Sequence, residues 1–224
     1  MTTKTAYIQG ELGTLSAPAQ RELFGLPGRR EFLVRSIGAP SKRVLDVGCA
    51  GGQIPLMLMR LGHEVTGIEL NEEMAAQARA RGVDVVEHDL EEPLPFKDES
   101  FDAAHAGEIV EHLFDTEGLL RELNRVLVPG GVLVMSTPNL NSLENRFRVL
   151  FGKPLPMWGA YPADRHGSHV RVLNKPKAIE LLRRAGFRPV EVAAMNQGRL
   201  APILDRAPTL SKMILFRAVK EAAA

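Results

Sequence analysis

Short apolar segments alternate with helical segments along residues 43–137, and this alternation constrains the fold more than any other feature of the chain. Strands are predicted where apolar residues follow one another without interruption, and helices where they recur every three or four positions. The predicted strands are 43–47, 64–68, 83–87, 101–106 and 132–137, and the predicted helices are 53–61, 72–81 and 116–127. This order is typical of a parallel sheet with helices on both faces.

The remaining segments extend this pattern at both ends. A helix is predicted over 175–185, and two final strands over 187–195 and 211–219 have no predicted helix between them, which favours an antiparallel hairpin at the sheet edge. The long irregular stretch 139–174 is of a kind that is usually functional or disordered. We therefore expect one α/β domain with a mostly parallel seven-stranded sheet. Its expected parts are a helical lead-in (1–41), a core (42–138), a lid insert after the fifth strand (139–174), and a C-terminal helix with the hairpin (175–224).

Composition excludes several classes of protein. Apolar residues make up 45% and charged residues 25% of the 224 residues, as in an ordinary globular domain. The single cysteine, Cys49, excludes an intrachain disulfide and a cysteine-based zinc site. No apolar run is long enough for a signal peptide or a membrane span, so we expect a cytoplasmic protein. The net charge of +1 disfavours a broad nucleic-acid surface.

A glycine-rich turn follows the first predicted strand, from Asp46 to Gly52. In open parallel sheets, ligands bind beyond the carboxyl ends of the strands, and small residues there let the backbone approach a ligand closely. A nicotinamide-dinucleotide turn requires Gly-x-Gly-x-x-Gly. Counted from Gly48, the second and third glycine positions are Ala50 and Gln53, so that pattern fails.

The segment VLDVGCAGG instead resembles motif I of the class I S-adenosylmethionine (SAM)-dependent methyltransferases, with Ala50 at the middle glycine. The resemblance continues in order through VTGIEL, EHDLEEPLPFKDESFD, SFDAAHAGEIVEHL and LLRELNRVLVPGGVLVMSTPN. It covers residues 40–140 and, less fully, 166–195. It implies a Rossmann-like, doubly wound fold.

The resemblance implies SAM as cofactor and S-adenosylhomocysteine as product. In this family an acidic residue after the second strand holds the ribose hydroxyls, which matches Glu69. Another acidic residue lies beside the adenine, which matches Asp89. Tyr7 and either Arg29 or Arg30 are candidates for the methionine end of the cofactor. The residues implied to bind the cofactor are Asp46, Gly48, Ala50, Gly52, Glu69, Leu70, Asp89, Leu90 and Glu108.

The acceptor side needs a group that removes a proton if the acceptor is a hydroxyl. Glu108, Glu111 and His112 in EIVEH share one face if this segment is a helical turn. The pattern resembles the metal site of the small-RNA 3′-terminal 2′-O-methyltransferases, in which a further histidine matches His169, or less well His166. The ubiquinone-biosynthesis O-methyltransferases carry a similar segment. The catalytic candidates are therefore His169, His112 and Glu111.

Two alternatives remain open at this site. The residues either hold a divalent metal, or His112 packs over the cofactor without a metal while Glu111 caps or pairs. Metal-free chemistry is the favoured alternative. We expect His63, His88 and His105 to be structural or surface residues.

The insert concentrates positive charge. Residues 139–177 carry seven basic and two acidic residues, together with Trp158 and Tyr161. NSLENRFRVLFG predicts an amphipathic helix with Leu143, Phe147, Leu150 and Phe151 on one side. A basic, aromatic lid suits an anionic acceptor, and a solvated basic face is the alternative.

The sequence thus predicts an O-methyltransferase that acts on a small-molecule, glycan or lipid-linked acceptor, as a monomer or homodimer. The alternatives are a metal-dependent RNA 3′-terminal 2′-O-methyltransferase and a non-catalytic SAM-binding partner protein.

Overall fold

The computed structural model describes residues 27–155, 169–196 and 201–221. Within these residues, seven strands form one sheet in the order β3-β2-β1-β4-β5-β7-β6. The strands are β1 (Arg43–Val47), β2 (Glu64–Glu69), β3 (Asp84–Glu87), β4 (Phe101–Gly107), β5 (Leu127–Pro138), β6 (Phe187–Met195) and β7 (Met213–Lys220). The predicted α/β class and seven-stranded sheet are confirmed.

Strand direction follows the prediction. The pairs β1–β2, β2–β3, β1–β4 and β4–β5 are parallel, and β7 is antiparallel to both β5 and β6. In β1 the four residues from Val44 to Val47 are all buried. Burial on both faces explains why this strand is an uninterrupted apolar run apart from Asp46.

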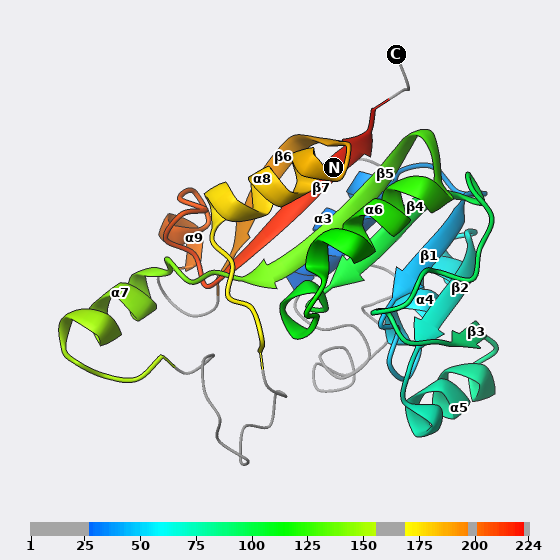
Figure 1. Ribbon diagram of the computed structural model, residues 1–224, viewed down its shortest axis with the longest axis horizontal. Helices are drawn as coiled ribbons and strands as arrows, with labels where there is room; N and C mark the ends of the chain where they lie inside the picture. Colours follow the sequence, from blue (N-terminus) through cyan, green and yellow to red (C-terminus); the bar gives the residue numbers. More distant parts are fainter. Residues whose placement is uncertain (1–26, 156–168, 197–200, 222–224) are drawn as a thin grey trace.

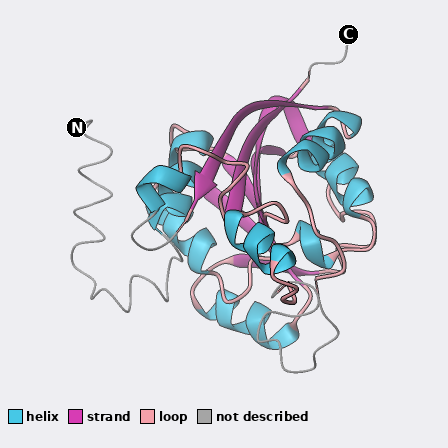
Figure 2. Ribbon diagram, turned by 90° about the vertical axis from the view of Figure 1, so that its left-hand side faces the viewer, coloured by secondary structure: helices cyan, strands magenta, loops and turns pink. Residues whose placement is uncertain are grey.

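Helices cover both faces of the sheet (Figures 1 and 2). One apolar cluster joins the sheet to α6 and α8, and another joins its opposite face to α3 and α4. In Figure 1, α6 and α8 lie in front of the sheet and α3 lies behind it. The helices are α3 (Pro27–Ile37), α4 (Gln53–Arg60), α5 (Glu72–Ala80), η1 (Val110–His112, a 3-10 turn), α6 (Thr116–Val126), α7 (Leu143–Leu150), α8 (Lys175–Arg184) and α9 (Ala201–Leu204).

Side-chain caps fix where four of these helices begin, among them α7, at which Ser142 accepts the N–H of Asn145. The side chain of Asn71 accepts the N–H of Met74 at the start of α5, and Asp115 accepts the N–H of Gly118 at the start of α6. Asn174 caps α8 in the same way. Each cap satisfies a backbone N–H that has no partner within its own helix.

Two predicted boundaries are wrong. The strand expected over 132–137 begins earlier, at Leu127, which pairs with Phe101 before the register shifts, so Pro129-Gly130-Gly131 lies within β5. The connection between the last two strands is not free of helix, since it contains the short α9. Local patterns favour a turn at Pro-Gly-Gly, but the long-range pairing with β4 overrides that preference.

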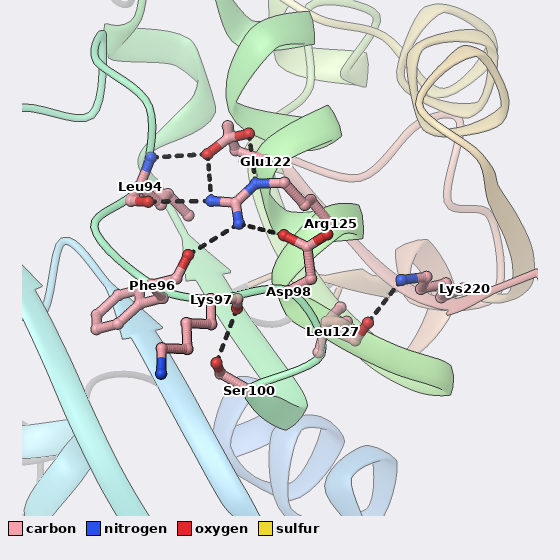
Figure 3. A network of polar contacts seen from close by, with 9 residues as sticks. All are labelled: Leu94, Phe96, Lys97, Asp98, Ser100, Glu122, Arg125, Leu127 and Lys220. Carbon is pink, nitrogen blue, oxygen red and sulfur yellow. Dashed lines mark hydrogen bonds and ion pairs between the residues drawn. The ribbon is translucent and has the colours of Figure 1, made fainter.

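A charged network fastens the loop between β3 and β4 to α6 (Figure 3). The guanidinium of Arg125 donates to the carbonyl oxygens of Leu94 and Phe96 and pairs with Asp98 and Glu122. Glu122 also accepts the N–H of Leu94, at 2.8 Å. The loop that follows the predicted adenine segment is therefore held to the helix that follows η1.

The predicted helix of the insert is present as α7, but it extends from the side of the molecule, away from η1 (Figure 1). Its aromatic side chains Phe147 and Phe151 are exposed and stack on each other. Thus α7 does not cover the carboxyl ends of β1 and β2, as a lid would. No helix among the described residues is long and apolar enough to cross a membrane.

Candidate functional site

A cavity of about 300 Å³ opens beyond the carboxyl ends of β1 and β2, beside η1. This size is at the lower end of the range for small-molecule sites. The position is the one at which open α/β sheets bind ligands. The lining residues are Gly48, Glu69, Leu70, Asp89, Leu90, Glu91, Ile109, His112, Leu113 and Phe114.

The glycine turn forms one wall of the cavity, and its backbone requires small residues. Gly48 and Gly52 both have positive φ, and a Cβ on Gly48 would lie 2.7 Å from Cδ1 of Ile109. A Cβ on Gly52 would lie 2.8 Å from Cβ of Ala78 on α5. Ala50 also has positive φ, at 45°, which is uncommon for a residue other than glycine. The turn thus combines close packing with a backbone conformation that favours glycine.

Glu69 lies where β2 ends, between the turn and α5. Its Oε2 accepts the N–H of Ala50 at 2.9 Å, and its Oε1 accepts the N–H of Asn71 at 2.8 Å. A carboxylate oxygen can accept more than one hydrogen bond, so both oxygens retain capacity toward the cavity. The backbone contacts fix the carboxylate in a position from which it can accept a pair of hydroxyl groups.

The predicted adenine segment lines the opposite part of the cavity. Asp89 accepts the N–H of Glu91 through Oδ1, which orders the short turn that carries Leu90. Leu90 is buried against the apolar core, whereas Leu70, across the cavity, is 64% exposed. A planar aromatic ring fits between an acidic edge and apolar side chains of this kind.

Asp46 has a partner that the sequence did not predict. Its Oδ1 lies 2.5 Å from Nδ1 of His105 on the neighbouring β4, and both side chains are buried. His105 is thus structural, as predicted, but it accounts for the one acidic residue inside β1. A buried carboxylate needs such a partner.

The acceptor-side candidates meet at η1. The rings of His112 and His169 are 4.8 Å apart between centroids, although His169 comes from the insert and His112 from η1. Ligand atoms of Glu111, His112 and His169 all lie within 4.8 Å of one another. The structure therefore brings together the three residues predicted to be catalytic.

The predicted shared helical face is wrong for Glu108. The helical turn begins only at Val110, and Glu108 precedes it with a positive φ of 58°. Glu108 is not part of the cluster of Glu111 with the two histidines, although its charge still acts on Glu111. Backbone strain of this kind is often found at functional sites.

Burial raises the pKa of two glutamates at this site, Glu108 and Glu111. Burial, followed by repulsion from Glu108, raises the pKa of Glu111 to about 8. Within the described residues, neither carboxylate oxygen of Glu111 accepts a hydrogen bond. Burial also raises the pKa of Glu108, against the opposing effect of the Arg29 guanidinium. An ionised Glu111 at this site would lack full compensation, which favours a proton or a cation there.

The predicted residues occupy distinct places around this site. Asp46, Ala50, Gly52 and Glu108 support the cavity without lining it, whereas the other five predicted cofactor residues line it. Tyr7, Trp158, Tyr161 and His166 lie outside the described residues. Four lining residues were missed: Glu91, Ile109, Leu113 and Phe114. The exposed Phe114 was the one available signal, since a large aromatic residue in a polar segment often marks a binding surface.

Comparison with known proteins agrees with this geometry. A family described as a methyltransferase domain matches residues 45–135. A ubiquinone biosynthesis O-methyltransferase of Xanthomonas campestris pv. campestris is 33% identical over 153 residues, which cover 61% of this chain and 64% of that protein. The chain contains a class I SAM-dependent methyltransferase domain.

Other members of the methyltransferase family match a larger share of the chain. A probable S-adenosylmethionine-dependent methyltransferase of Mycolicibacterium smegmatis is 33% identical over 166 residues, covering 72% of this chain and 58% of that protein. The chain thus spans less than two thirds of the length of both curated relatives. The crystal structure of a Mesorhizobium loti S-adenosylmethionine-dependent methyltransferase shares the fold, with a TM-score of 0.66 and 24% identity over 88% of this chain and 99% of that one.

Proposed function

We propose that this protein transfers a methyl group from SAM to a hydroxyl group of a small-molecule, glycan or lipid-linked acceptor. One observation carries the proposal: the cavity lined by Glu69 and Asp89 adjoins the cluster of Glu111, His112 and His169. A cofactor site and a group able to take a proton thus lie side by side. The name of the Xanthomonas relative, an O-methyltransferase, supports a hydroxyl acceptor.

The residues of the cavity fit SAM. Glu69 would accept hydrogen bonds from both ribose hydroxyls, and Asp89 would accept one from the adenine amino group. The backbone of the glycine turn at Gly48 leaves room for the cofactor to lie close to β1. The guanidinium of Arg29 approaches Gly107 and acts on Glu108, so it is the candidate for the methionine carboxylate.

Bound SAM supplies an activated methyl group, and the protein must align an acceptor oxygen with it and remove the hydroxyl proton. Glu111 is a poor base at neutral pH because burial keeps its pKa near 8 and its carboxyl largely protonated. We therefore assign proton removal to His169 or His112. Glu111 would then orient one of these imidazoles.

A divalent cation at the same cluster is the second candidate, and the clustering of Glu111, His112 and His169 favours it. A carboxylate and two imidazoles suit a first-row divalent metal such as Mn²⁺ or Zn²⁺. These three residues would hold the ion, which would lower the pKa of a bound acceptor hydroxyl. A cation would also compensate the buried charge of Glu111.

Charge in the insert gives weaker support for an anionic acceptor than the sequence suggested. Arg148 pairs with Glu144, Lys177 pairs with Glu180, and Arg146 donates to a backbone carbonyl. The RNA alternative rests on the resemblance of the acidic-histidine cluster and gains nothing further from the described surface.

Two measurements test the proposal. Calorimetric titration with S-adenosylhomocysteine should show binding by the purified protein, and absence of binding would refute the cofactor assignment. Methyl transfer from radiolabelled SAM should then be measured on catechols, sugars and a 3′-terminal RNA oligonucleotide, each with EDTA or with Mn²⁺. Transfer to a hydroxyl compound in EDTA supports the metal-free form, and transfer only with Mn²⁺ supports the metal form. Transfer to RNA alone would contradict the small-molecule acceptor.

The non-catalytic alternative is tested by the same panel. A protein that binds S-adenosylhomocysteine but methylates no acceptor under either condition would fit a SAM-binding partner. If His169 is the base, His169→Ala should abolish transfer while it preserves cofactor affinity. His112→Ala tests the other candidate, and its cofactor affinity is measured as well because His112 lines the cavity. Wild-type activity in both variants would contradict the assignment of the base.

A further inference from the structure

The loop between η1 and α6 adjoins both the cofactor cavity and the acceptor cluster. Leu113 and Phe114 line the cavity, and His112, directly before them, lines the cavity and also belongs to the cluster. Leu113 packs in the apolar core, whereas the Phe114 side chain is 73% exposed, so packing does little to fix the loop at Phe114. There the position of the loop depends on polar contacts of its backbone.

Arg171 supplies these contacts from the acceptor side. Its Nε donates to the carbonyl oxygens of Leu113 and Phe114, at 3.2 and 3.0 Å, and its Nη2 also donates to the Phe114 carbonyl. The backbone N–H groups of Val170 and Arg171 both donate to the Glu111 carbonyl, at 3.0 and 3.1 Å. The guanidinium therefore binds the backbone of this loop.

Glu91 holds the same loop from the cofactor side. Its carboxylate accepts the N–H of Phe114 at 2.6 Å and the N–H of Asp115 at 3.0 Å. The carboxylate and the guanidinium of Arg171 thus bind opposite backbone groups of one short segment. Charge-assisted contacts of this kind are stronger than those between neutral groups.

The segment 169–173, which contains Arg171, is held at Leu173 by contacts outside the loop. Leu173 forms a parallel bridge with Asn139, and its carbonyl accepts the N–H of Leu140 at 2.8 Å. His169 lies at the other end, two residues before Arg171. The place of its ring therefore depends on the contacts that Arg171 and Val170 make with the loop.

We propose that Arg171 is a positioning residue that sets His169 against His112 and Glu111. The proposal rests on the proposed function only in treating His169 as part of the acceptor site. Arg171 touches neither the cofactor cavity nor the reacting atoms, and it acts through the loop and the segment that carries His169. Loss of the guanidinium should displace the His169 ring while the Glu91 side of the loop continues to form the cavity wall.

The test compares Arg171→Ala and Arg171→Lys with the wild-type chain. Arg183→Ala, an exposed arginine on α8, is the matched control. The nuclear Overhauser effect between the ring protons of His112 and His169, in histidine-labelled protein, reports their contact directly. Calorimetry with S-adenosylhomocysteine reports the cofactor cavity, and thermal unfolding reports the fold.

Arg171→Ala should abolish the ring–ring effect and change the affinity for S-adenosylhomocysteine less than twofold. On whichever hydroxyl acceptor the wild type methylates, kcat/KM for the acceptor should fall about 10- to 100-fold, because small displacements at a reacting centre have effects of this size. KM for SAM should stay unchanged. Arg171→Lys, which retains the charge but not the planar fork, should give an intermediate ring contact.

A ring–ring effect of full strength in Arg171→Ala would overturn the proposal. A loss of S-adenosylhomocysteine affinity as large as the loss of kcat/KM for the acceptor would overturn it as well. If Arg171→Ala does not fold, full wild-type ring contact in a folded Arg171→Lys would overturn it as well. The ring contact and the cofactor affinity are measured without an acceptor. A wild type that methylates no hydroxyl compound would therefore refute the proposed function and leave these two readouts to decide the role of Arg171.

Discussion

Glu69 and Ala50 are joined by a hydrogen bond of 2.9 Å from the Ala50 N–H to Oε2 of Glu69. This contact links the end of β2 to the glycine turn after β1. The Glu69 carboxylate is therefore placed to bind the cofactor, and it also holds Ala50, which has a positive φ, in position.

Replacement of Glu69 should therefore affect both binding and stability. Glu69→Ala should weaken S-adenosylhomocysteine binding about 10- to 100-fold, since a hydrogen bond to a charged group contributes about 1.5–3 kcal/mol. It should also lower the melting temperature, because the N–H groups of Ala50 and Asn71 lose their acceptor. Calorimetry and thermal unfolding measure the two effects. Glu64→Ala, at the exposed start of β2, should change neither, and unchanged affinity in Glu69→Ala would contradict the ribose assignment.

Gly52 and Gly82 have similar φ angles, but they differ in how much room a Cβ atom would find. Their φ angles are 82° and 84°, but a Cβ on Gly52 would meet Ala78 whereas a Cβ on Gly82 would meet nothing within 4 Å. Gly82→Ala should lower the free energy of unfolding by about 1–2 kcal/mol, the cost of a left-handed backbone. Gly52→Ala should lower it by about 1–3 kcal/mol more because of overpacking against α5.

Urea unfolding measures both variants. A loss in Gly52→Ala no larger than in Gly82→Ala would show that the turn can move away from α5, and that close packing at Ala78 is not what requires glycine there. S-adenosylhomocysteine affinity should fall in Gly52→Ala alone, since only that glycine belongs to the turn beside the cavity.

The sequence predicted best what depends on local pattern. Short, mostly apolar runs located β1 and β4, because strands buried on both faces tolerate few polar residues. The glycines of the turn indicated a ligand site. Gly48 and Gly52 have positive φ, and because glycine is the residue that favours this conformation, such positions can be recognised in the sequence. The cofactor side of the site was therefore largely predictable.

Contacts between distant segments were not predictable in the same way. Nothing near Asp46 in the sequence indicates that His105 will pair with it, since that pairing follows from the β1–β4 register. The spacing of Glu108, Glu111 and His112 predicts one helical turn, but the positive φ of Glu108 excludes that residue from the turn. The role of Arg171 was hidden for the same reason, because its partners are backbone carbonyls, which leave no trace in the residue types of the loop.

Arg125 should contribute more to stability than an exposed ion pair does. Its guanidinium donates to the partly buried carbonyl oxygens of Leu94 and Phe96 (Figure 3). The Leu94 carbonyl also accepts the N–H of Phe96 at 2.8 Å. Arg125→Met should lower the free energy of unfolding by about 1–3 kcal/mol, the cost of unsatisfied buried groups. Arg121→Met, one turn earlier on α6 with a single exposed ion pair, should cost less than about 0.5 kcal/mol. Equal losses in urea unfolding would contradict this account of the network.

Glu111 should make the stability of the protein fall as pH rises toward 8. Its carboxyl has an ordinary pKa of 4.5 when unfolded and a pKa of about 8 in the buried site. Between these values the folded state retains a proton that the unfolded state releases. Raising the pH through this window therefore favours unfolding, with a slope of at most about 1.4 kcal/mol per pH unit from this group. The contribution is fully favourable below pH 4.5 and is lost as the pH passes 8.

The measurement is the free energy of unfolding in urea at several pH values from 5.5 to about 8.5, in EDTA so that no cation compensates the charge. Glu111→Gln keeps the shape of the side chain but cannot ionise, so the difference in stability between wild type and variant should change with pH in the direction given above. Glu64→Gln, an exposed carboxylate, should leave the wild-type slope intact. A difference between wild type and Glu111→Gln that does not vary with pH would show that Glu111 is already ionised in the folded protein, which would require a cation or a hydrogen-bond donor beside it.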